Sequence, residues 1–304
     1  MVVILRHHLR KNCCLLQGDS SGNLPLGKSS GEPGLIFRYP GAKSKFLPIF
    51  RREFYPSLKD TFTDVFVGGG SVLLDVAEHF PDIKLHANDL NENIFSFWKL
   101  VSGEQPLDSF FQLLDQKPTI ELFYHLKDTP PISLEDFAYR GIFFNRTTFS
   151  GIETAGPIGG RLQKSQWTID CRYNAAKLKT EILKARALLK GRTVVTNINA
   201  SVSLDAFNGF LYLDPPYYVK GDQLYRYKMD KEAHSRLASL LKSIPSWVLS
   251  YDSCPEIEKL YADFSIEYLD ARYSINGSKT TWAKSSEVLI RPQEADCKLP
   301  RCGA

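Results

Sequence analysis

The sequence predicts an α/β fold in which a doubly wound, mostly parallel sheet carries helices on both faces. Three observations support this prediction. Short runs of β-branched and aromatic residues alternate with amphipathic segments along the chain. A strand, a glycine turn, a helix and a second strand follow one another between residues 63 and 89. Later strands end in turn residues and are separated by helical patterns, as in open α/β sheets.

The expected elements divide the chain into a main domain and an insertion. Strands are expected over residues 63–67, 84–87, 194–197, 209–213, 247–251, 264–269 and 287–290, and helices over 71–80, 134–144, 175–190, 231–243 and 256–261. Residues 91–192 fit the alternation poorly, so we expect a mainly helical insertion with a hairpin there. Residues 35–90 and 193–291 would form the main domain, between a flexible Gly-, Ser- and Pro-rich lead over 1–34 and a tail over 292–304.

Composition narrows the class of protein. The 304 residues include 43% hydrophobic and 24% charged residues, which predicts a packed globular core. No apolar run approaches a membrane span, and basic residues interrupt the first apolar stretch, so we expect neither a membrane anchor nor a secretory signal. The cysteines and histidines lack metal-ligand spacing, which predicts no metal site and favours a reducing, cytoplasmic location. The net charge of +4 permits a nucleic-acid partner without indicating one.

A glycine turn follows the first expected strand. Three glycines at residues 68–70 come after Phe66, and such a turn lets a ligand approach the backbone and a helix N-terminus. Asp89 follows about 20 residues later, at the end of the next strand, where a carboxylate can accept both ribose hydroxyls. Leu73 stands where a dinucleotide fingerprint needs its third glycine. The pattern therefore favours a nucleoside without a pyrophosphate, and S-adenosylmethionine is such a ligand.

A stronger signal follows the buried strand that ends at residue 213. Asp214, Pro215, Pro216 and Tyr217 form an acid-Pro-Pro-Tyr turn at the carboxyl end of this strand, where open α/β sheets bind ligands. The prolines fix the turn and offer no N–H donor, so the Asp214 carboxylate and the Pro215 carbonyl can point at one spot. Tyr217 adds a flat aromatic face.

Two acceptors at one spot suit the exocyclic amine of adenine. The lone pair of this amine is delocalised into the ring, which makes the nitrogen a poor nucleophile. One acceptor for each N–H favours a pyramidal nitrogen that can attack a sulfonium methyl group in line. The turn therefore predicts catalysis by positioning and electrostatics, with Tyr217 stacking on a base that has left the duplex.

The ordered motifs resemble the Dam-type (D12 class) adenine-N6 DNA methyltransferases in the alpha arrangement. Five blocks occur in the family's order between residues 36 and 291: RYPGAK, DVFVGGG, NDLN, FFNRTTFSG with a later CRYN, and LDPPYY. The resemblance implies a Rossmann-like, S-adenosylmethionine-dependent methyltransferase fold. It also implies that the main domain is catalytic, that the insertion recognises double-stranded DNA, and that a cognate restriction endonuclease is one conceivable partner.

The resemblance assigns roles to individual residues. Tyr39 and Lys43 match the cofactor-contacting block near the N-terminus, and Asp89 matches the acid on the cofactor ribose. Phe66, Gly68 and Gly70 match the glycine loop. Asp214, Pro215, Pro216 and Tyr217 match the catalytic block, and Asp214 also lies against the cofactor in the family.

One departure concerns DNA recognition. Residues 151–170 form a segment that compact GATC-methylating members lack, so GATC specificity does not follow from the resemblance. Basic residues in and near this segment are candidates for contacts to base edges or phosphates, and Gln163 is a further candidate for a base edge. The candidate DNA contacts are Arg146, Thr148, Arg161, Lys164 and Arg172, together with Lys220 after the catalytic turn.

Other readings remain open from the sequence. Cytosine-N4 enzymes more often carry Ser at the position of Asp214, and protein glutamine methyltransferases carry Asn there. An unpaired base in RNA is a further substrate for the same chemistry. A catalytically dead DNA-binding homologue is the alternative from another class, against which the intact Asp89, Asp214 and Tyr217 argue.

Overall fold

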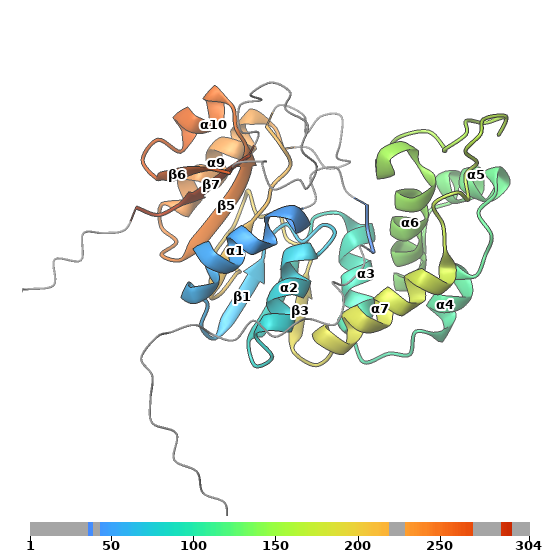
Figure 1. Cartoon of the computed structure of the whole chain (residues 1–304), viewed down its shortest axis with the longest axis horizontal. Helices are drawn as coiled ribbons and strands as arrows, with labels where there is room; N and C mark the ends of the chain where they lie inside the picture. Colours follow the sequence, from blue (N-terminus) through green and yellow to red (C-terminus); the bar gives the residue numbers. More distant parts are fainter. Residues whose placement is uncertain (1–35, 39–42, 219–228, 270–286, 294–304) are drawn as a thin grey trace, which may run out of the picture. The chain divides into compact units, whose positions relative to one another are not determined.

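A computed structural model describes residues 36–38, 43–218, 229–269 and 287–293 of the chain. These residues form a sheet with the strand order β3-β2-β1-β4-β5-β7-β6 (Figure 1). The strands are β1 (Thr61–Asp64), β2 (Lys84–Asn88), β3 (Thr193–Thr196), β4 (Phe210–Leu213), β5 (Trp247–Asp252), β6 (Ser265–Leu269) and β7 (Glu287–Arg291). Strands β1 to β5 pair in parallel, whereas β7 is antiparallel to both β5 and β6. The predicted doubly wound, mostly parallel sheet is confirmed.

Helices occupy most of the remaining described chain. They are α1 (Leu47–Glu53), α2 (Ser71–His79), α3 (Glu92–Ser102), α4 (Asp108–Leu114), α5 (Ile120–Asp128), α6 (Leu134–Thr147), α7 (Ala175–Leu189), α9 (Lys231–Leu241) and α10 (Pro255–Leu260). Short 3₁₀ turns cover Lys43–Phe46, Tyr55–Ser57 and Phe149–Gly151. None of the helices in the described ranges combines the length and the apolar character that crossing a membrane requires.

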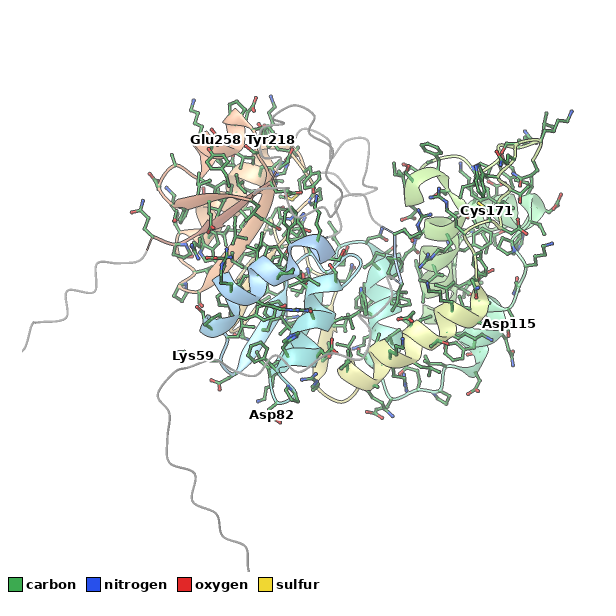
Figure 2. All side chains as sticks on the ribbon, in the orientation of Figure 1. Lys59, Asp82, Asp115, Cys171, Tyr218 and Glu258 are labelled. Atoms are coloured by element: carbon green, nitrogen blue, oxygen red, sulfur yellow. The ribbon has the colours of Figure 1, made fainter. Side chains whose placement is uncertain are left out.

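Side chains fill the space around the strands and helices (Figure 2), and alternate residues of β4 belong to two separate apolar clusters. On β4, Phe210 and Tyr212 join the apolar cluster that contains α1, α2, α3 and α7, while Leu211 and Leu213 join the cluster that contains α9 and α10. Strands buried on both faces lose the polar alternation of a half-exposed strand. This is why β4 reads in the sequence as a continuous apolar run.

The segment between β2 and β3 carries five helices, α3 to α7. Helix α3 packs against α6 and also contacts β3, so the insertion shares its apolar core with the sheet. Ser133 begins α6 with a reciprocal capping box to Asp136, and Thr119 caps α5, a helix that periodicity did not indicate. Where a hairpin was expected, one isolated bridge pairs Thr148 with Pro157, and turns follow it.

Two glycines at matched backbone angles give a test of the sheet's packing. Gly209 and Gly191 both have φ of +79°, but a Cβ on Gly209 would lie 2.3 Å from the Thr61 carbonyl oxygen, and one on Gly191 meets nothing within 4 Å. We expect Gly191→Ala to lower the free energy of unfolding by about 1 kcal/mol, because alanine tolerates left-handed backbone poorly. Gly209→Ala should cost about 2 kcal/mol more, because β1 must move. Urea denaturation measures both, and equal losses would contradict the steric argument.

Candidate active site

The carboxyl ends of β1, β2 and β4 meet at one edge of the sheet because these strands are parallel neighbours. The glycine turn follows β1, Asp89 follows β2 and Asp214 follows β4. Phe66, which precedes the glycine turn, lines one cavity of about 250 Å³ together with Asp89 and Asp214. The lining side chains that bear on the argument are Phe66, Asp89, Ile94, Ile198, Asp214 and Pro216.

Asp89 holds the glycine turn against the end of β2. Its Oδ2 accepts a hydrogen bond from the Gly68 N–H at 2.9 Å, and its Oδ1 accepts one from the Asn91 N–H at 2.9 Å. Burial raises the pKa of Asp89 to about 6, even though these two N–H groups favour the ionised form. The carboxylate is therefore oriented by the backbone before any ligand arrives.

Trp98 on α3 contacts the glycine turn through a hydrogen bond to Gly68 and through packing against Gly70. Its Nε1 donates to the Gly68 carbonyl at 2.9 Å, and a Cβ on Gly70 would lie 2.3 Å from its ring. Gly70 has φ of +70°, so both the backbone angle and the tryptophan require glycine there. The sequence did not distinguish Trp98 from an ordinary core residue, because the contact joins segments thirty residues apart.

Asn88, the last residue of β2, lines the cavity and forms hydrogen bonds with the segments that follow β1 and β3. Its Nδ2 donates to the Val65 and Ile198 carbonyls, each at 3.0 Å, and its Oδ1 accepts from the Ile198 N–H and the Thr196 hydroxyl at 2.8 Å. The side chain is 1% exposed. The Asn88 amide therefore connects the segments after β1 and β3. The NDLN block in the sequence did not predict this structural role.

The catalytic turn is held from two sides. Asp214 Oδ1 forms an ion pair with Lys43 Nζ at 2.7 Å and accepts a hydrogen bond from the Ser250 hydroxyl at 3.1 Å. The Tyr218 N–H donates to Asp252 Oδ1 at 3.1 Å, which fixes the far end of the turn. Among the described residues, no group donates to Asp214 Oδ2, and the carboxylate lines the cavity. Oδ1 is thus anchored by two side chains, whereas Oδ2 has no hydrogen-bond donor among the described residues.

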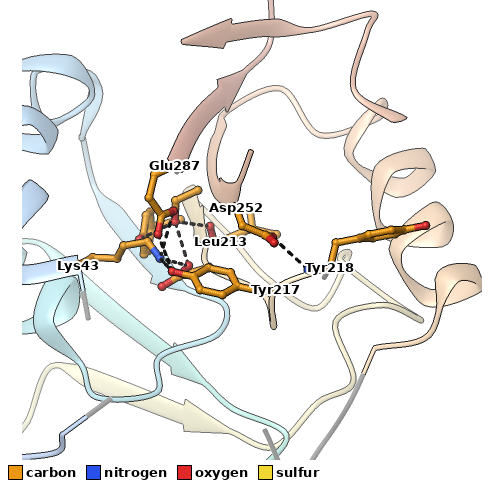
Figure 3. A network of polar contacts seen from close by, with 9 residues as sticks. Lys43, Leu213, Tyr217, Tyr218, Asp252 and Glu287 are labelled. Atoms are coloured by element: carbon orange, nitrogen blue, oxygen red, sulfur yellow. Dashed lines mark hydrogen bonds and ion pairs between the residues drawn. The ribbon is translucent and has the colours of Figure 1, made fainter. Parts of the chain in front are cut away.

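A buried polar network surrounds the anchored oxygen (Figure 3). The Tyr217 hydroxyl donates to Glu287 Oε1 at 2.5 Å, and Lys43 Nζ donates to the Tyr217 hydroxyl at 3.3 Å. Lys43 Nζ also lies 3.7 Å from Glu287 Oε2 and 5.0 Å from the centre of the Tyr217 ring. Lys43 is 2% exposed and Glu287 5% exposed. One ammonium is therefore shared between two carboxylates and fixes the tyrosine ring.

The charges in this network depend on each other. Burial opposes the ammonium form, but the Asp214 and Glu287 carboxylates outweigh it and raise the pKa of Lys43. Burial raises the pKa of Glu287, and Lys43 opposes that shift. The resemblance assigned Lys43 to the cofactor, yet the structure places its Nζ against Asp214 and Glu287. The sequence did not predict Glu287 as a site residue, because it begins the antiparallel strand β7 and belongs to no motif.

Asp64, which ends β1, is a third carboxyl group near the cavity. It is 2% exposed, and its Oδ1 has no hydrogen-bond partner within the described part of the chain. Burial, followed by the charges of Asp214 and Asp89, raises its pKa well above the usual range. The environment therefore favours the protonated form, which can donate a hydrogen bond. Its position four residues before the first glycine of the turn was the only sequence signal for it.

The candidate DNA contacts fall into different environments. Arg161 and Lys164 are exposed, whereas Thr148 is fully buried and its hydroxyl donates to the Phe144 carbonyl at 2.6 Å. This buried position does not suit a direct contact to DNA. Tyr39 and Lys220 lie outside the described residues.

Arg146 and Arg172 border a second cavity, of about 430 Å³, together with Arg38 and Lys177. Burial, and then the charge of Arg38, lowers the pKa of Arg146 to about 10. Nη1 of Arg38 is buried and has no hydrogen-bond partner among the described residues. Glu181 also lines this cavity. Cations gathered around a hollow with one carboxylate suit an anionic ligand such as a phosphate.

The described residues contain no group of His, Cys, Asp and Glu arranged to hold a metal ion.

A model of the D12 class N6 adenine-specific DNA methyltransferases matches residues 39–275, which is more than three quarters of the chain. The chain belongs to this family. The predicted family, fold class and enzyme class are therefore confirmed: the protein is an adenine-specific DNA methyltransferase with a methyltransferase fold.

Similar proteins carry related descriptions. The type II methyltransferase M.MjaIII of Methanocaldococcus jannaschii is 24% identical over 279 residues, which cover 79% of this adenine methyltransferase and 92% of that protein. M.CviBI of Paramecium bursaria Chlorella virus NC1A, also a type II methyltransferase, is 20% identical over 212 residues, or 68% and 78% of the two chains. The solved rRNA methyltransferase aviRa from Streptomyces viridochromogenes aligns with a TM-score of 0.32 and 11% identity, over 84% of this chain and 88% of its own.

The shared ammonium predicts that Glu287 affects methyl transfer without touching substrate. Glu287→Gln keeps an acceptor for the Tyr217 hydroxyl but removes the charge that draws Lys43 away from Asp214. Asp214 should then be a weaker acceptor for the target amine, and kcat should fall about tenfold or more while the KM for the methyl donor stays unchanged. Steady-state kinetics with labelled methyl donor measure this split.

Glu267→Gln is the matched control for this variant. Glu267 lies on β6, pairs with Arg291 at 3.1 Å and does not line the cavity. Its loss should leave kcat unchanged. If Glu287→Gln kept full kcat, or raised only the KM for the methyl donor, the positioning role would be wrong.

Proposed function

We propose that this methyltransferase transfers the methyl group of S-adenosylmethionine to N6 of adenine in double-stranded DNA, after the target base has left the helix. The observation that carries this proposal is the placement of Asp214, whose Oδ1 is anchored by Lys43 and Ser250 while the carboxylate faces the cavity. The same cavity holds the Asp89 carboxylate and the apolar side chains of Phe66, Ile94 and Ile198.

The cavity fits a nucleoside methyl donor in its chemistry. Asp89 has two oxygens already aligned by N–H donors of Gly68 and Asn91, which leaves lone pairs for ribose hydroxyls. Ile94 and Ile198 offer apolar contact for a base, and the Asp214 carboxylate complements a positive sulfonium. These carboxylates and apolar side chains suit a ligand without a pyrophosphate group. When bound, S-adenosylmethionine supplies an electrophilic methyl group.

The chain's own groups prepare the target amine. Asp214 Oδ2 and the Pro215 carbonyl would each accept one N–H of the adenine amine, which favours a pyramidal nitrogen with an exposed lone pair. Tyr217, whose hydroxyl is fixed by Glu287, would hold the base by stacking. Asp214 is also placed to receive the proton that the nitrogen loses after methylation. These roles for Asp214, Pro215, Pro216 and Tyr217 require no covalent intermediate.

The insertion is proposed as the DNA-recognition region. The cavity lined by Arg38, Arg146 and Arg172 would take a backbone phosphate, because a phosphate relieves the mutual repulsion of these cations. Such contacts fix the register of the protein on the duplex but do not read sequence. The type II designation of the two relatives fits a role beside a restriction endonuclease that recognises the same DNA word.

A labelled-methyl assay tests the reaction directly. Incubation with duplex DNA and labelled S-adenosylmethionine, followed by digestion to nucleosides, should place the label in N6-methyladenine. Asp214→Ala should abolish turnover, because the amine loses its acceptor, and should weaken cofactor binding without removing it. Label found only in cytosine, RNA or protein would replace the proposal, and full activity of Asp214→Ala would show that the site lies elsewhere.

The raised pKa of Asp89 predicts a pH-dependent cofactor affinity. The carboxylate is ionised above its pKa of about 6 and then accepts from both ribose hydroxyls, so affinity should fall as the pH drops through that value. Calorimetric titration with S-adenosylhomocysteine on both sides of pH 6 measures the change. Asp89→Asn should bind weakly at every pH. An affinity of the unmodified protein that is flat across this range would refute the proposed ribose contact.

A further inference from the structure

Tyr218, which follows the catalytic turn, contacts a buried histidine on α9. The centre of its ring lies 5.0 Å from the centre of the His234 ring, and the two planes are inclined by 50°. His234 is 2% exposed. Figure 3 shows the Tyr217 and Tyr218 rings pointing in opposite directions, with Tyr217 toward Lys43 and Tyr218 away from it. The catalytic turn is therefore held on a second side, away from the lysine network.

His234 is itself held by β5. Its Nδ1 forms a hydrogen bond with the Tyr251 hydroxyl, and the two ring centres lie 5.7 Å apart. Tyr251 is fully buried, and burial raises its pKa well above the usual range, so the phenol keeps its proton. A phenol that keeps its proton can donate it to Nδ1 of a neutral imidazole. The hydrogen bond then fixes the orientation of the His234 ring.

Three consecutive residues of β5 serve the catalytic turn. Ser250 bonds to the carboxylate at the start of the turn, and Asp252 accepts from the Tyr218 N–H at its end, each at 3.1 Å. Successive side chains of a strand point to opposite faces of the sheet. Tyr251 accordingly belongs to the apolar cluster that contains α9, and it reaches the turn through the histidine on that helix.

The surroundings of His234 favour a neutral ring. Burial lowers its pKa below the usual 6.5, and the charges of Asp252 and Asp230, with the Met229 carbonyl, offset only part of this shift. Asp252 comes from β5, whereas Asp230 begins α9 and accepts from the Ala233 N–H at 2.7 Å. Within the described ranges, these two carboxylates and the two tyrosine hydroxyls are the titratable groups that face the imidazole. At neutral pH the ring therefore carries no charge.

We propose that neutral His234 is a positioning residue for methyl transfer, which holds Tyr218 and with it the end of the catalytic turn. This inference rests on the proposed function, in which the turn supplies the acceptors for the target amine. Pro215 and Pro216 have fixed φ angles, so a shift of Tyr218 passes to the Pro215 carbonyl instead of being absorbed within the turn. Misplacing such a group by about 1 Å costs about 100-fold in rate. His234 acts through Tyr218 and not by contact with substrate.

Two variants remove this support in different ways. His234→Asn keeps an acceptor near the position of Nδ1 but removes the ring beside Tyr218, whereas Tyr251→Phe keeps both rings and frees the imidazole to rotate. His234→Asn should lower kcat about tenfold, and Tyr251→Phe by a smaller factor. The KM for S-adenosylmethionine should stay unchanged, because Asp89 is not disturbed. The double variant should be no slower than His234→Asn alone, since both changes break one chain of contacts.

The assay is steady-state kinetics with labelled methyl donor. The DNA is a short duplex containing a sequence that the unmodified protein methylates, located first by mapping methylated adenines in DNA from cells that express it. Both the duplex and the donor are kept saturating when kcat is measured. Saturation matters because Asp89, with its pKa of about 6, changes the affinity for the donor in the same pH range.

The pH dependence of kcat separates positioning from a purely structural role. Protonated His234 carries an N–H on both ring nitrogens, so it no longer accepts from Tyr251, and its charge draws the Asp252 carboxylate away from the Tyr218 N–H. In the unmodified protein, kcat should therefore fall as the pH drops through the pKa of His234, below 6.5. In His234→Asn this fall should be absent, because no imidazole titrates at that position.

His125→Asn is the matched control, because it makes the same replacement at an exposed position on α5 that lines neither cavity. It should leave kcat and its pH profile unchanged. The melting temperature and the S-adenosylhomocysteine affinity of each variant show whether the protein is folded with an intact cofactor site. If His234→Asn does not fold, the milder Tyr251→Phe variant carries the same test of kcat against KM.

Three results would overturn the inference. The folded variants at positions 234 and 251 could methylate DNA at the rate of the unmodified protein, which would leave the histidine a structural role alone. They could raise only the KM for the donor, which would place the effect at the cofactor. The kcat of His234→Asn could keep the fall below pH 6.5, or the unmodified protein could lack it, so that neutral His234 is not what the turn requires. Failure of the unmodified protein to methylate adenine in duplex DNA would instead refute the proposed function, so the two failures are distinguishable.

Discussion

The ion pair between Lys43 and Asp214 is the interaction on which the candidate site depends. Lys43 is almost completely buried, and bringing an ammonium into the interior costs more free energy than one carboxylate normally returns. Glu287 and the Tyr217 hydroxyl supply the additional contacts that make this burial tolerable. The arrangement is better understood as a device for orientation than for stability. It anchors one oxygen of Asp214 and fixes the tyrosine ring, and under the proposed function the second carboxylate oxygen accepts from the target amine.

This network joins parts of the chain that are far apart in sequence. Lys43 comes from the first described turn, Asp214 follows β4, and Glu287 begins β7. The parallel pairing of β1, β2 and β4 brings the glycine turn, Asp89 and Asp214 to one edge, and the antiparallel β7 then delivers Glu287 to the same place. The strand order therefore brings the candidate cofactor and catalytic residues together, whereas the charge balance around Asp214 depends on β7, a strand outside the parallel set.

The sequence revealed the parts of the site that are local in the chain. The turn from Asp214 to Tyr217 and the glycine turn before α2 are contiguous, so residue type and spacing were enough to find them. Trp98, Asn88 and Glu287 act through contacts to distant segments, and no spacing rule marks them. The strands were predicted to within a few residues because buried β-branched and aromatic runs leave a clear pattern. Helix α5 lacked such a pattern, since only Phe123 among its residues is buried.

In the insertion, residue type alone does not reveal that two candidate polar side chains already bond to the backbone of the fold. Thr148 and Gln163 have the chemistry to read DNA, but Thr148 bonds to the Phe144 carbonyl, and Gln163 bonds to the backbone groups of Ile158 and Ile169. A turn-rich segment has few ladder hydrogen bonds, so its polar side chains must satisfy peptide groups that strands and helices would satisfy unaided.

The end of α6 connects the two cavities of the protein. Asn145 lines the first cavity and clamps the Arg38 backbone, accepting from its N–H at 2.7 Å and donating to its carbonyl at 2.9 Å. Arg146, the next residue, lines the second cavity together with the Arg38 side chain. A phosphate bound by Arg38 and Arg146 would therefore contact the last turn of α6, and Asn145 of the same turn lines the cavity proposed for the methyl donor. Under the proposed function, two consecutive residues of α6 border the DNA-binding cavity and the cofactor cavity, so a duplex bound at the basic cavity lies against the helix that also lines the cavity with Asp214.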